Sequence, residues 1–425
     1  MIKRIFAKLL GTLARAVVKK YRPKIVAITG SVGKTTTRAA CVAVLSTGFR
    51  VRGTEKNYNN ELGVPLTILG CEPPGHSIFA WLGVFIKGVW LLGANDPRFP
   101  QVLVVEMGAD HPGDLAYLMS IAPPDVGVVT AVSAAHTEFF SSVDGVLAEK
   151  KTVVTTLGSD RTAIINGDDE HLRKIVGEIA AQKLSFGFGQ SASVQAKDSE
   201  ILYAEDGLPF GMQAQVSVDG AEFGVKIPRA LGKPVVYAAL ASIAVGRAMG
   251  LSLIEIQTGL IGFEPPAGRL RILEGVKRTT LIDDTYNASP RAAKEALDTL
   301  SSLTGGGRRI AVLGDMLELG TLTEELHREI GRYAAMRGVD ILITVGAASR
   351  FTAEDARAAG LDESQVFSFD TARDAGPFLQ ERMHEGDIVL IKGSQGVRCE
   401  RIVKEVMAEP LRAEKLIVRQ TREWV

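Results

Sequence analysis

A glycine-rich turn between an apolar run and a run compatible with a helix constrains the fold of this chain more than any other feature. Residues 25–37 read Ile-Val-Ala-Ile-Thr-Gly-Ser-Val-Gly-Lys-Thr-Thr-Thr. The apolar run predicts a buried strand, and the glycines allow a tight turn into the helix. Backbone N–H groups at the start of such a helix can face phosphate oxygens. The pattern therefore predicts a phosphate-binding loop at the carboxyl end of a strand in an α/β sheet.

The residues of this loop have distinct predicted roles. Lys34 would bridge the terminal phosphates of a nucleotide, and the hydroxyl of Thr35 would bind Mg²⁺. The loop lacks the first glycine of the usual motif, where this chain has Ile28, so it is a shortened variant. The alternative is a chance Gly-Lys-Thr in a surface turn, which the preceding strand disfavours. The residues expected around the phosphates are Gly30, Ser31, Gly33, Lys34, Thr35 and Thr36.

Length and composition limit the class of protein. A chain of 425 residues is too long for one hydrophobic core and fits two or three domains. Its 46% hydrophobic and 23% charged residues are typical of a soluble globular protein. The cysteines Cys41, Cys71 and Cys399 match no metal or redox spacing, so a reducing, cytoplasmic location is expected, with these residues as small buried side chains.

The N-terminal segment is basic and has helical periodicity. Residues 1–54 contain twelve Lys/Arg and no Asp/Glu. Apolar residues recur at helical spacing through residues 1–20, with lysines and arginines off that stripe. A cleaved signal peptide is not expected, because charges interrupt the apolar run. The pattern predicts a basic amphipathic helix over residues 1–22, which either lies on a membrane surface or packs on the following domain.

A second segment, residues 77–93, is strongly apolar and aromatic. It carries one charge, Lys87, and prolines flank it. Seventeen residues are marginal for a membrane span, so the segment either packs into the core or contributes to a patch on a membrane surface. The two segments together predict peripheral membrane contact, at the inner face of the cell membrane, through residues 1–20 and 77–93.

The remaining pattern predicts an α/β protein with two large domains. Apolar strand-like runs alternate with helical stretches, which indicates a parallel sheet with ligands at the carboxyl ends of its strands. Residues 194–227 alternate as in a small antiparallel sheet, and residues 265–268 resemble a linker. We expect a P-loop-type, parallel-sheet ATPase domain over 23–264, with the insert 77–93, and a Rossmann-like C-terminal α/β domain over 265–425. Strands of the second domain are expected at 280–282, 310–313, 341–345 and 388–391.

Motifs spread along the chain carry a family resemblance. From about residue 24 to about residue 408 the chain resembles the Mur ligases, most closely those that add D-alanyl-D-alanine. The segments that carry the resemblance are Thr29–Thr36, Asn57–Pro65, Glu106–Gly108, Ala135–Glu138, Lys150, Gly268–Leu270, Asp283–Pro290, Gly314–Gly320 with His327, and Lys392–Gly396.

The resemblance implies an ATP-dependent amide ligase of peptidoglycan synthesis. Such ligases convert a carboxylate to an acyl phosphate, which an amine then attacks. ATP and Mg²⁺ are the implied cofactors, and a muramyl-peptide carboxylate with D-Ala-D-Ala or a similar amino acid or dipeptide are the implied substrates, with no nucleic acid. The alternatives are a ligase acting on a lipid-linked muropeptide or a folylpolyglutamate- or cyanophycin-type acceptor, and a membrane-bound pseudoenzyme or scaffold.

The resemblance also implies residue roles. Thr35 and Glu106 would bind one Mg²⁺, and Glu106, His136 and a carbamylated Lys150 a second, although Lys151 leaves the register open. Lys34, His136, Lys150 and Arg269 would be catalytic. Asn166, Arg269, Asp283, Tyr286 and Asn287 would contact the nucleotide, some of them on domain closure. The substrate residues would be Asn59, Asn60, Glu61, His327, Lys392 and Ser394.

The chain also departs from the family pattern. Gly232-Lys233-Pro234-Val235 stands where the family usually has a His-Asn pair that contacts adenine. Gln395 and Ser289 replace a usual arginine and asparagine. Only about 23 residues precede the first strand, in place of the usual N-terminal domain. We therefore expect the carboxylate substrate to be presented at a membrane, or a partner protein to supply part of its recognition.

Overall fold

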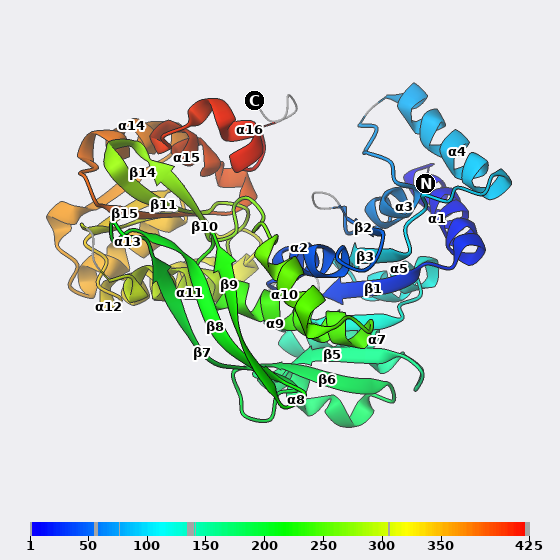
Figure 1. The fold of residues 1–425 in the computed structure, drawn as a ribbon. Coiled ribbons are helices and arrows are strands. Elements are labelled where there is room, and N and C mark those ends of the chain that lie inside the picture. The colour runs from blue at the N-terminus through cyan, green and yellow to red at the C-terminus, as the bar shows by residue number, and fades with distance from the viewer. Residues whose placement is uncertain are drawn as a thin grey trace. The chain divides into compact units, whose positions relative to one another are not determined.

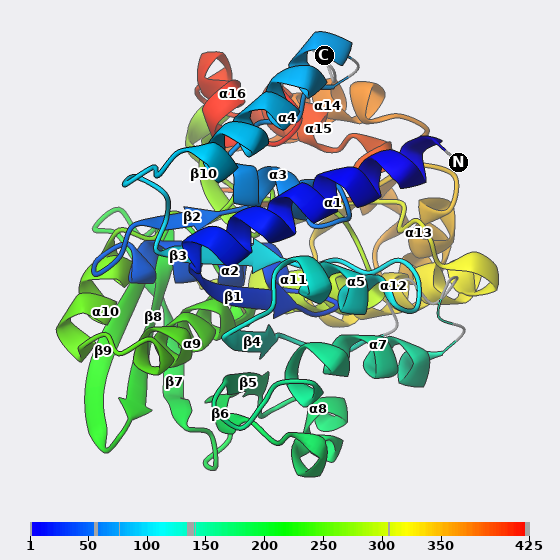
Figure 2. The same cartoon turned by 90° about the vertical axis from the view of Figure 1, so that its right-hand side faces the viewer.

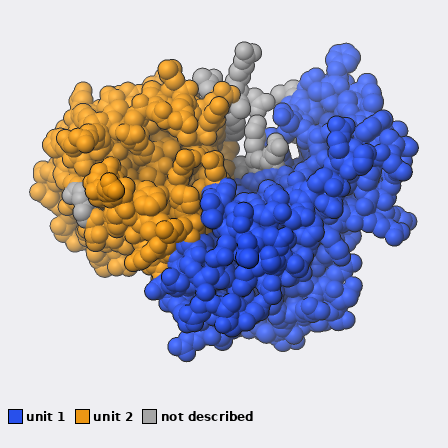
Figure 3. Space-filling view, viewed as in Figure 1, with its two compact units in different colours: residues 1–198, 214–225, 237–263 blue, residues 199–213, 226–236, 264–425 orange. Residues whose placement is uncertain are grey.

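The computed structural model describes residues 2–54, 58–75, 77–133, 140, 142–304 and 307–420. Figure 1 shows the order of the elements along the chain. Contacts divide the chain into two compact units, coloured in Figure 3: unit 1 comprises residues 1–198, 214–225 and 237–263, and unit 2 comprises 199–213, 226–236 and 264–425.

Unit 1 contains most of a nine-stranded sheet with the order β2-β3-β1-β4-β5-β6-β7-β8-β9, of which parts of β7, β8 and β9 belong to unit 2. The strands β1 to β6 are parallel, and β1, β3 and β4 are buried along nearly their whole length, as their apolar sequences predict. The predicted parallel α/β sheet is confirmed. The six strands are β1 (Lys24–Thr29), β2 (Val51–Gly53), β3 (Val102–Glu106), β4 (Val126–Val129), β5 (Thr162–Asn166) and β6 (Gln182–Gly187).

The strands β7 (Val194–Tyr203), β8 (Pro209–Val218) and β9 (Ala221–Pro228) correct one expectation. They follow one another through short turns, as the alternating sequence predicts, but they do not form a separate small sheet. Phe186 and Gly187 of β6 pair in parallel with β7, so the three strands extend the large sheet.

Helices follow the strands of unit 1. The helix α2 begins directly after the glycine-rich turn, and α7 packs against β4. The helices of this part of the chain are α2 (Lys34–Leu45), α3 (Gly63–Leu69), α5 (Asp114–Ile121), α7 (Val143–Thr155), α8 (Glu170–Lys174), α9 (Lys233–Ala248) and α10 (Leu253–Ile261).

The N-terminal segment forms α1 (Ile2–Tyr21), and its apolar side is covered by protein. Leu10, Ala14 and Val17 are fully buried in the core of unit 1, so the packed-helix alternative is confirmed for this element. Leu9, another apolar residue of this helix, is 57% exposed.

The segment 77–93 forms α4 (Ile78–Gly93), which lies beside α1 (Figure 2). Only Val84, Gly88 and Leu91 of this helix are buried, so the core-packing alternative is wrong for most of its side chains. Among the described residues, no helix is both long and apolar enough to cross a membrane.

Unit 2 contains a six-stranded sheet with the order β10-β11-β15-β12-β13-β14. The four predicted strands are confirmed as β11 (Thr279–Asp284), β12 (Arg309–Gly314), β13 (Ile341–Val345) and β15 (Ile388–Lys392), all parallel. Two edge strands were not predicted from the sequence: β10 (Arg271–Gly275), which is antiparallel, and β14 (Val366–Phe369). The helices are α11 (Pro290–Ser302), α12 (Thr323–Met336), α13 (Ser349–Ala358), α14 (Ala372–Arg382), α15 (Glu400–Val406) and α16 (Ala413–Leu416).

Candidate active site

The glycine-rich turn joins the carboxyl end of β1 to the start of α2 and is fixed by the segment after β4. Ser31 donates its N–H to the carbonyl of Ala131 at 2.8 Å, and the Thr130 hydroxyl donates to the carbonyl of Val32 at 2.6 Å. Gly30 has φ +148°, and a Cβ there would lie 2.0 Å from Thr130 Oγ1. Because the first N–H groups of a helix have no partner within it, this turn forms an anion cradle at the start of α2.

Lys34, the first residue of α2, folds back over the cradle. Its Nζ donates to the carbonyl of Gly30 at 2.7 Å, and the side chain is half-buried. The ammonium therefore lies at the mouth of the turn, where it can reach bound phosphate oxygens.

Glu106, at the end of β3, meets Thr35 of the neighbouring strand–helix junction. Its Oε1 accepts hydrogen bonds from Thr35 Oγ1 at 3.3 Å and from Asn59 Nδ2 at 3.2 Å. The side chain is nearly fully buried, and its Oε2 has no hydrogen-bond partner, with Arg38 Nε 3.6 Å away. A carboxylate and a hydroxyl oxygen are ligands that Mg²⁺ prefers, so these residues fit the predicted ion.

Lys150 of α7 is buried, whereas the adjacent Lys151 is on the surface side. Only 2% of Lys150 is exposed, and Lys151 pairs with Glu178 at 2.6 Å. Burial, and to a lesser extent the positive charge of Lys34, lowers the pKa of the Lys150 ammonium to about 7. The geometry thus favours Lys150 over Lys151 as the lysine available in its neutral form. Its expected companion His136 lies outside the described residues.

Asn166 and Asn60 are both used by the fold. Asn166 Nδ2 donates to the carbonyl of Thr130 at 3.0 Å, and its Oδ1 accepts from the N–H of Asp168 at 3.0 Å. Asn60 Oδ1 accepts from the N–H groups of Leu62 and Gly63 before α3. Glu61 is exposed. The ligand contacts assigned to these three residues stay predictions.

In unit 2, Arg269 and Tyr286 lie together. The Arg269 guanidinium is 3.9 Å from the centre of the Tyr286 ring, and its buried Nε makes no hydrogen bond. Asn287, next to Tyr286, is exposed. An arginine held against a ring with an unsatisfied N–H is a candidate for an incoming anion.

Asp283 holds the backbone next to Arg269 in place. Its carboxylate accepts from the N–H of Gly268 at 3.0 Å and from the N–H and hydroxyl of Thr285. The residue is fully buried, and this burial raises the pKa of the carboxyl to about 6. Asp283 therefore fixes the turn that carries Arg269.

The three residues expected near the amine substrate are buried: Lys392 ends β15, Ser394 follows it, and His327 lies in α12. Lys392 Nζ donates to Asp284 Oδ2 at 2.6 Å, and Ser394 Oγ accepts from the N–H of Leu317. His327 is 1% exposed: its Nε2 accepts from the N–H of Met316, and its Nδ1 contacts the carbonyl of Thr323 at 2.7 Å. Burial lowers the pKa of this imidazole. Nε2 of His327 thus holds the loop at Met316 and Nδ1 contacts the first turn of its own helix, and the substrate contact expected of His327 stays a prediction.

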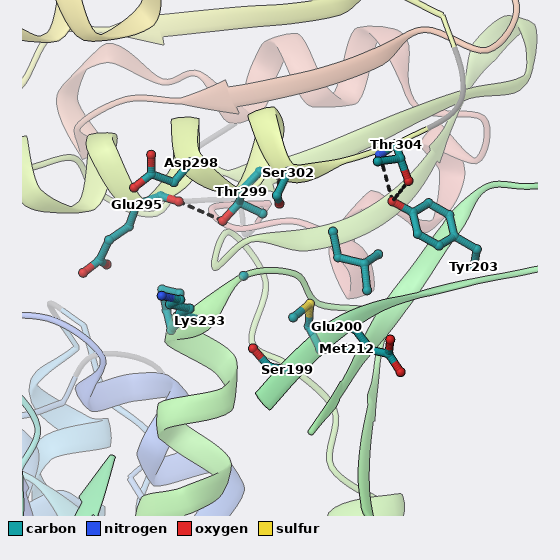
Figure 4. A pocket seen from close by; sticks show the side chains of 13 residues that line it. Ser199, Glu200, Tyr203, Met212, Lys233, Glu295, Asp298, Thr299, Ser302 and Thr304 are labelled. Atoms are coloured by element: carbon teal, nitrogen blue, oxygen red, sulfur yellow. Dashed lines mark hydrogen bonds between the residues drawn. The ribbon is translucent and has the colours of Figure 1, made fainter. Parts of the chain in front are cut away.

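A cavity of about 700 Å³ opens within unit 2 between β7, β8, α11 and the start of α9 (Figure 4). Thr304 donates its N–H to the Tyr203 hydroxyl at 2.9 Å at one end of it. Gly232, Lys233 and Pro234 line the other end, and Val235 is buried. Pro234 therefore presents an apolar ring to the cavity, and Val235 is buried without lining it.

Three residues with clear roles were missed from sequence. Arg38 faces Glu106, Thr130 fixes the phosphate turn, and Asp284 pairs with Lys392. The position of Asp284 at the end of a buried strand was an available signal, whereas its neighbour Asp283 was assigned a role from the family resemblance alone.

An anion cradle beside a buried carboxylate and a buried lysine, on a parallel sheet, defines a P-loop nucleotide-dependent enzyme. The Mur ligase middle domain matches residues 28–81 and 92–246, and the Mur ligase glutamate ligase domain matches residues 268–395. The chain belongs to the Mur ligase family.

Similar proteins come from several bacteria. The chain is 31% identical over 402 residues to a UDP-N-acetylmuramoyl-tripeptide–D-alanyl-D-alanine ligase of Bacillus subtilis (strain 168), covering 95% of this chain and 80% of that protein. A ligase of the same name from Escherichia coli (strain K12) is 29% identical, covering 93% and 79%. Solved structures of MurF from Acinetobacter baumannii and of MurF from Thermotoga maritima in complex with ADP each give a TM-score of 0.77 at 28% identity. They cover 93% and 94% of this chain, and 79% and 83% of those chains.

Proposed function

We propose that this chain is an ATP-dependent ligase that joins D-alanyl-D-alanine to the free carboxylate of UDP-N-acetylmuramoyl-tripeptide during peptidoglycan precursor synthesis. One observation carries the proposal. This chain is similar over 95% of its length to a ligase of that name, and it also brings Glu106 and Thr35 together beside a phosphate cradle.

The residues of unit 1 suit the first chemical step, transfer of the γ-phosphoryl group of ATP to the substrate carboxylate. The cradle and Lys34 would hold the phosphates, so that an anionic carboxylate can approach an anionic phosphate. Mg²⁺ bound by Thr35 and Glu106 would offset the remaining negative charge. Lys150, with a pKa of about 7, has the neutral amine that carbamylation requires, and a carbamate oxygen would suit a second Mg²⁺.

The residues of unit 2 suit charge stabilisation and substrate placement. Arg269 would neutralise the transferring phosphoryl group, and the loops held by His327, Lys392 and Ser394 would shape the site for the amine. The amine then attacks the acyl phosphate, so that the amide forms as phosphate leaves.

The test is phosphate release from ATP and Mg²⁺ with UDP-muramyl-tripeptide and D-Ala-D-Ala, with the product mass measured in the same sample. We expect amide product, ADP and phosphate in equal amounts, and no turnover in Lys34→Ala. Full activity in Lys34→Ala would contradict the phosphate assignment. ATP binding without product would contradict the substrate assignment and favour a lipid-linked or folyl-type acceptor.

We propose a cytoplasmic location with peripheral attachment at the inner face of the cell membrane. The described part of the chain supports this with an exposed apolar face on α4. A partner protein that assists substrate recognition stays a prediction.

A further inference from the structure

The outward side of α4 consists of large apolar side chains. Six large apolar residues along one arc of the helix are highly exposed to solvent. Their exposed fractions are Ile78 81%, Phe79 86%, Leu82 56%, Ile86 60%, Val89 62% and Trp90 49%. A surface helix of a globular protein normally turns its polar side outward. The arrangement in α4 is the reverse, and exposed apolar patches of this size mark interaction sites.

The single charge of α4 does not interrupt this arc. Lys87 Nζ donates to the carbonyl of Gly70, on the side of the helix that faces the protein. The glycines Gly83 and Gly93 have open space where a side chain would begin. The whole outward face of α4 is therefore free of ionised groups.

The inward side of α4 is held firmly on α1. The Phe6 ring packs edge-on against Trp81 and Phe85, with ring centres 4.7 and 5.3 Å apart. Lys20 Nζ and Tyr21 Oη both donate to the carbonyl of Leu91 near the end of α4, at 2.9 and 3.0 Å. The apolar face is thus a fixed part of the fold.

Most of this face lies in a gap of the family match. The match to the Mur ligase middle domain stops at residue 81 and resumes at residue 92, so it omits Leu82, Ile86, Val89 and Trp90. The matched ligase domain therefore gives no reason for these four exposed apolar side chains.

The neighbouring charge selects the partner. The exposed side of α1, which lies beside α4 in Figure 2, carries Lys8, Arg15 and Lys19, and the first 54 residues contain no acidic residue. An anionic bilayer complements both features, because apolar side chains enter the acyl boundary while lysines contact the headgroups. Pairing with a second copy through this face would bring two cationic α1 helices together.

We propose that α4 is an interfacial helix that docks the protein on an anionic lipid surface, flanked by the lysines of α1. A helix of 16 residues is about 24 Å long, shorter than the roughly 30 Å hydrocarbon core, so it lies in the interface. The inserting element is α4, whereas the apolar stripe of α1 is used for packing. This inference is independent of the ligase reaction.

The experiment is vesicle cosedimentation of the full-length protein with two charge-matched double variants. One variant carries Phe79→Asp and Ile86→Asp on α4. The control carries Ile254→Asp and Ile261→Asp on α10, where the exposed fractions are a comparable 76% and 75%. Both add two carboxylates at exposed apolar positions, so any general effect of charge is shared.

We expect wild type and control to bind vesicles containing about one-third phosphatidylglycerol, and to bind pure phosphatidylcholine about tenfold more weakly. The α4 variant should bind the anionic vesicles at least about tenfold more weakly than the control. Trp90 fluorescence should shift to the blue on binding, and Trp90→Phe should lose most of that shift.

Three results would overturn the proposal: no binding of wild type to either vesicle, equal weakening in both double variants, or a dimer in light scattering that only the α4 variant disrupts. The last result would assign the face to a second copy. Thermal unfolding of each variant confirms that it is folded, and phosphate release without vesicles tests the ligase reaction separately.

Discussion

Lys150 and Lys151 are adjacent in sequence but lie in opposite environments, which makes them a matched pair. Lys150→Ala removes the buried amine near Lys34 and should lower phosphate release at least about hundredfold, as expected for loss of a charge-stabilising group. Lys151→Ala removes only a surface pair with Glu178 and should stay within about twofold. Equal losses in the two variants would show that Lys150 has no special role.

Asp283 predicts a pH dependence of stability. Its pKa is raised by burial to about 6, so the folded state binds more protons than the unfolded state between pH about 4 and 6. Stability from this group is therefore present at low pH and is lost as pH rises through 6. Between pH 4.5 and 7 the wild type should lose about 2 kcal/mol relative to Asp283→Asn.

The measurement is urea unfolding of both proteins across this pH range, without nucleotide. Asp387, which is also buried but is paired with Arg308, serves as a control, because its pKa is lowered and its contribution has the opposite sign. Parallel stability curves for wild type and Asp283→Asn would contradict the burial argument.

At the residue scale, the sequence identified which polar residues matter better than it identified which way their side chains point. Thr35 and Glu106 were expected to share one Mg²⁺ from the family resemblance, and their side chains meet in the structure. Asp283 and His327 were assigned ligand contacts, yet both are buried and bonded to backbone groups. Spacing along a strand or helix does not reveal whether a polar side chain turns toward a ligand or toward its own loop.

At the element scale, the phosphate turn depends on the space available at its glycines. Gly30→Ala places a Cβ 2.0 Å from Thr130 Oγ1 at a positive φ, and should lower the free energy of unfolding by about 3 kcal/mol. Gly33→Ala meets its nearest atom at 3.7 Å, so only the positive φ costs energy, about 1 kcal/mol.

Chemical denaturation of the two variants without nucleotide checks this difference. Because neither measurement involves a ligand, altered phosphate binding cannot mimic the effect. Similar losses in both variants would show that the segment after β4 moves aside, and that the turn is less firmly fixed than its hydrogen bonds indicate.

Elements were predictable where burial on both faces leaves an apolar run, as in β1, β3 and β13. Two edge strands escaped because β10 alternates with charged residues and β14 has four residues. The apolar stripe of α1 was visible in the sequence, but periodicity does not say what covers a stripe. The structure shows that protein covers α1, whereas no described residue covers the outward face of α4.

At the scale of the whole molecule, the proposed ligase reaction would draw different residues from the two units. Unit 1 holds the phosphate cradle, Glu106 and Lys150, and unit 2 holds Arg269 on a turn anchored by Asp283. The phosphates would be bound mainly by the cradle, so an arginine of the other unit should act on the transition state more than on the bound nucleotide.

Arg269→Ala should therefore lower kcat at least about hundredfold while changing the Kd of ATP less than about fivefold. The control is Arg278→Ala, an exposed arginine of the same unit that pairs with Glu385 at 2.9 Å, and it should leave both quantities within about twofold. Phosphate release gives kcat, and equilibrium nucleotide binding gives Kd. If Kd rose by the same factor as kcat fell, Arg269 would be a binding group for the ground state, and the cradle of unit 1 would not suffice to hold the nucleotide. If only kcat falls, catalysis requires an arginine from the unit that does not hold the phosphates. ATP bound by unit 1 alone is then protected from hydrolysis until unit 2 supplies Arg269.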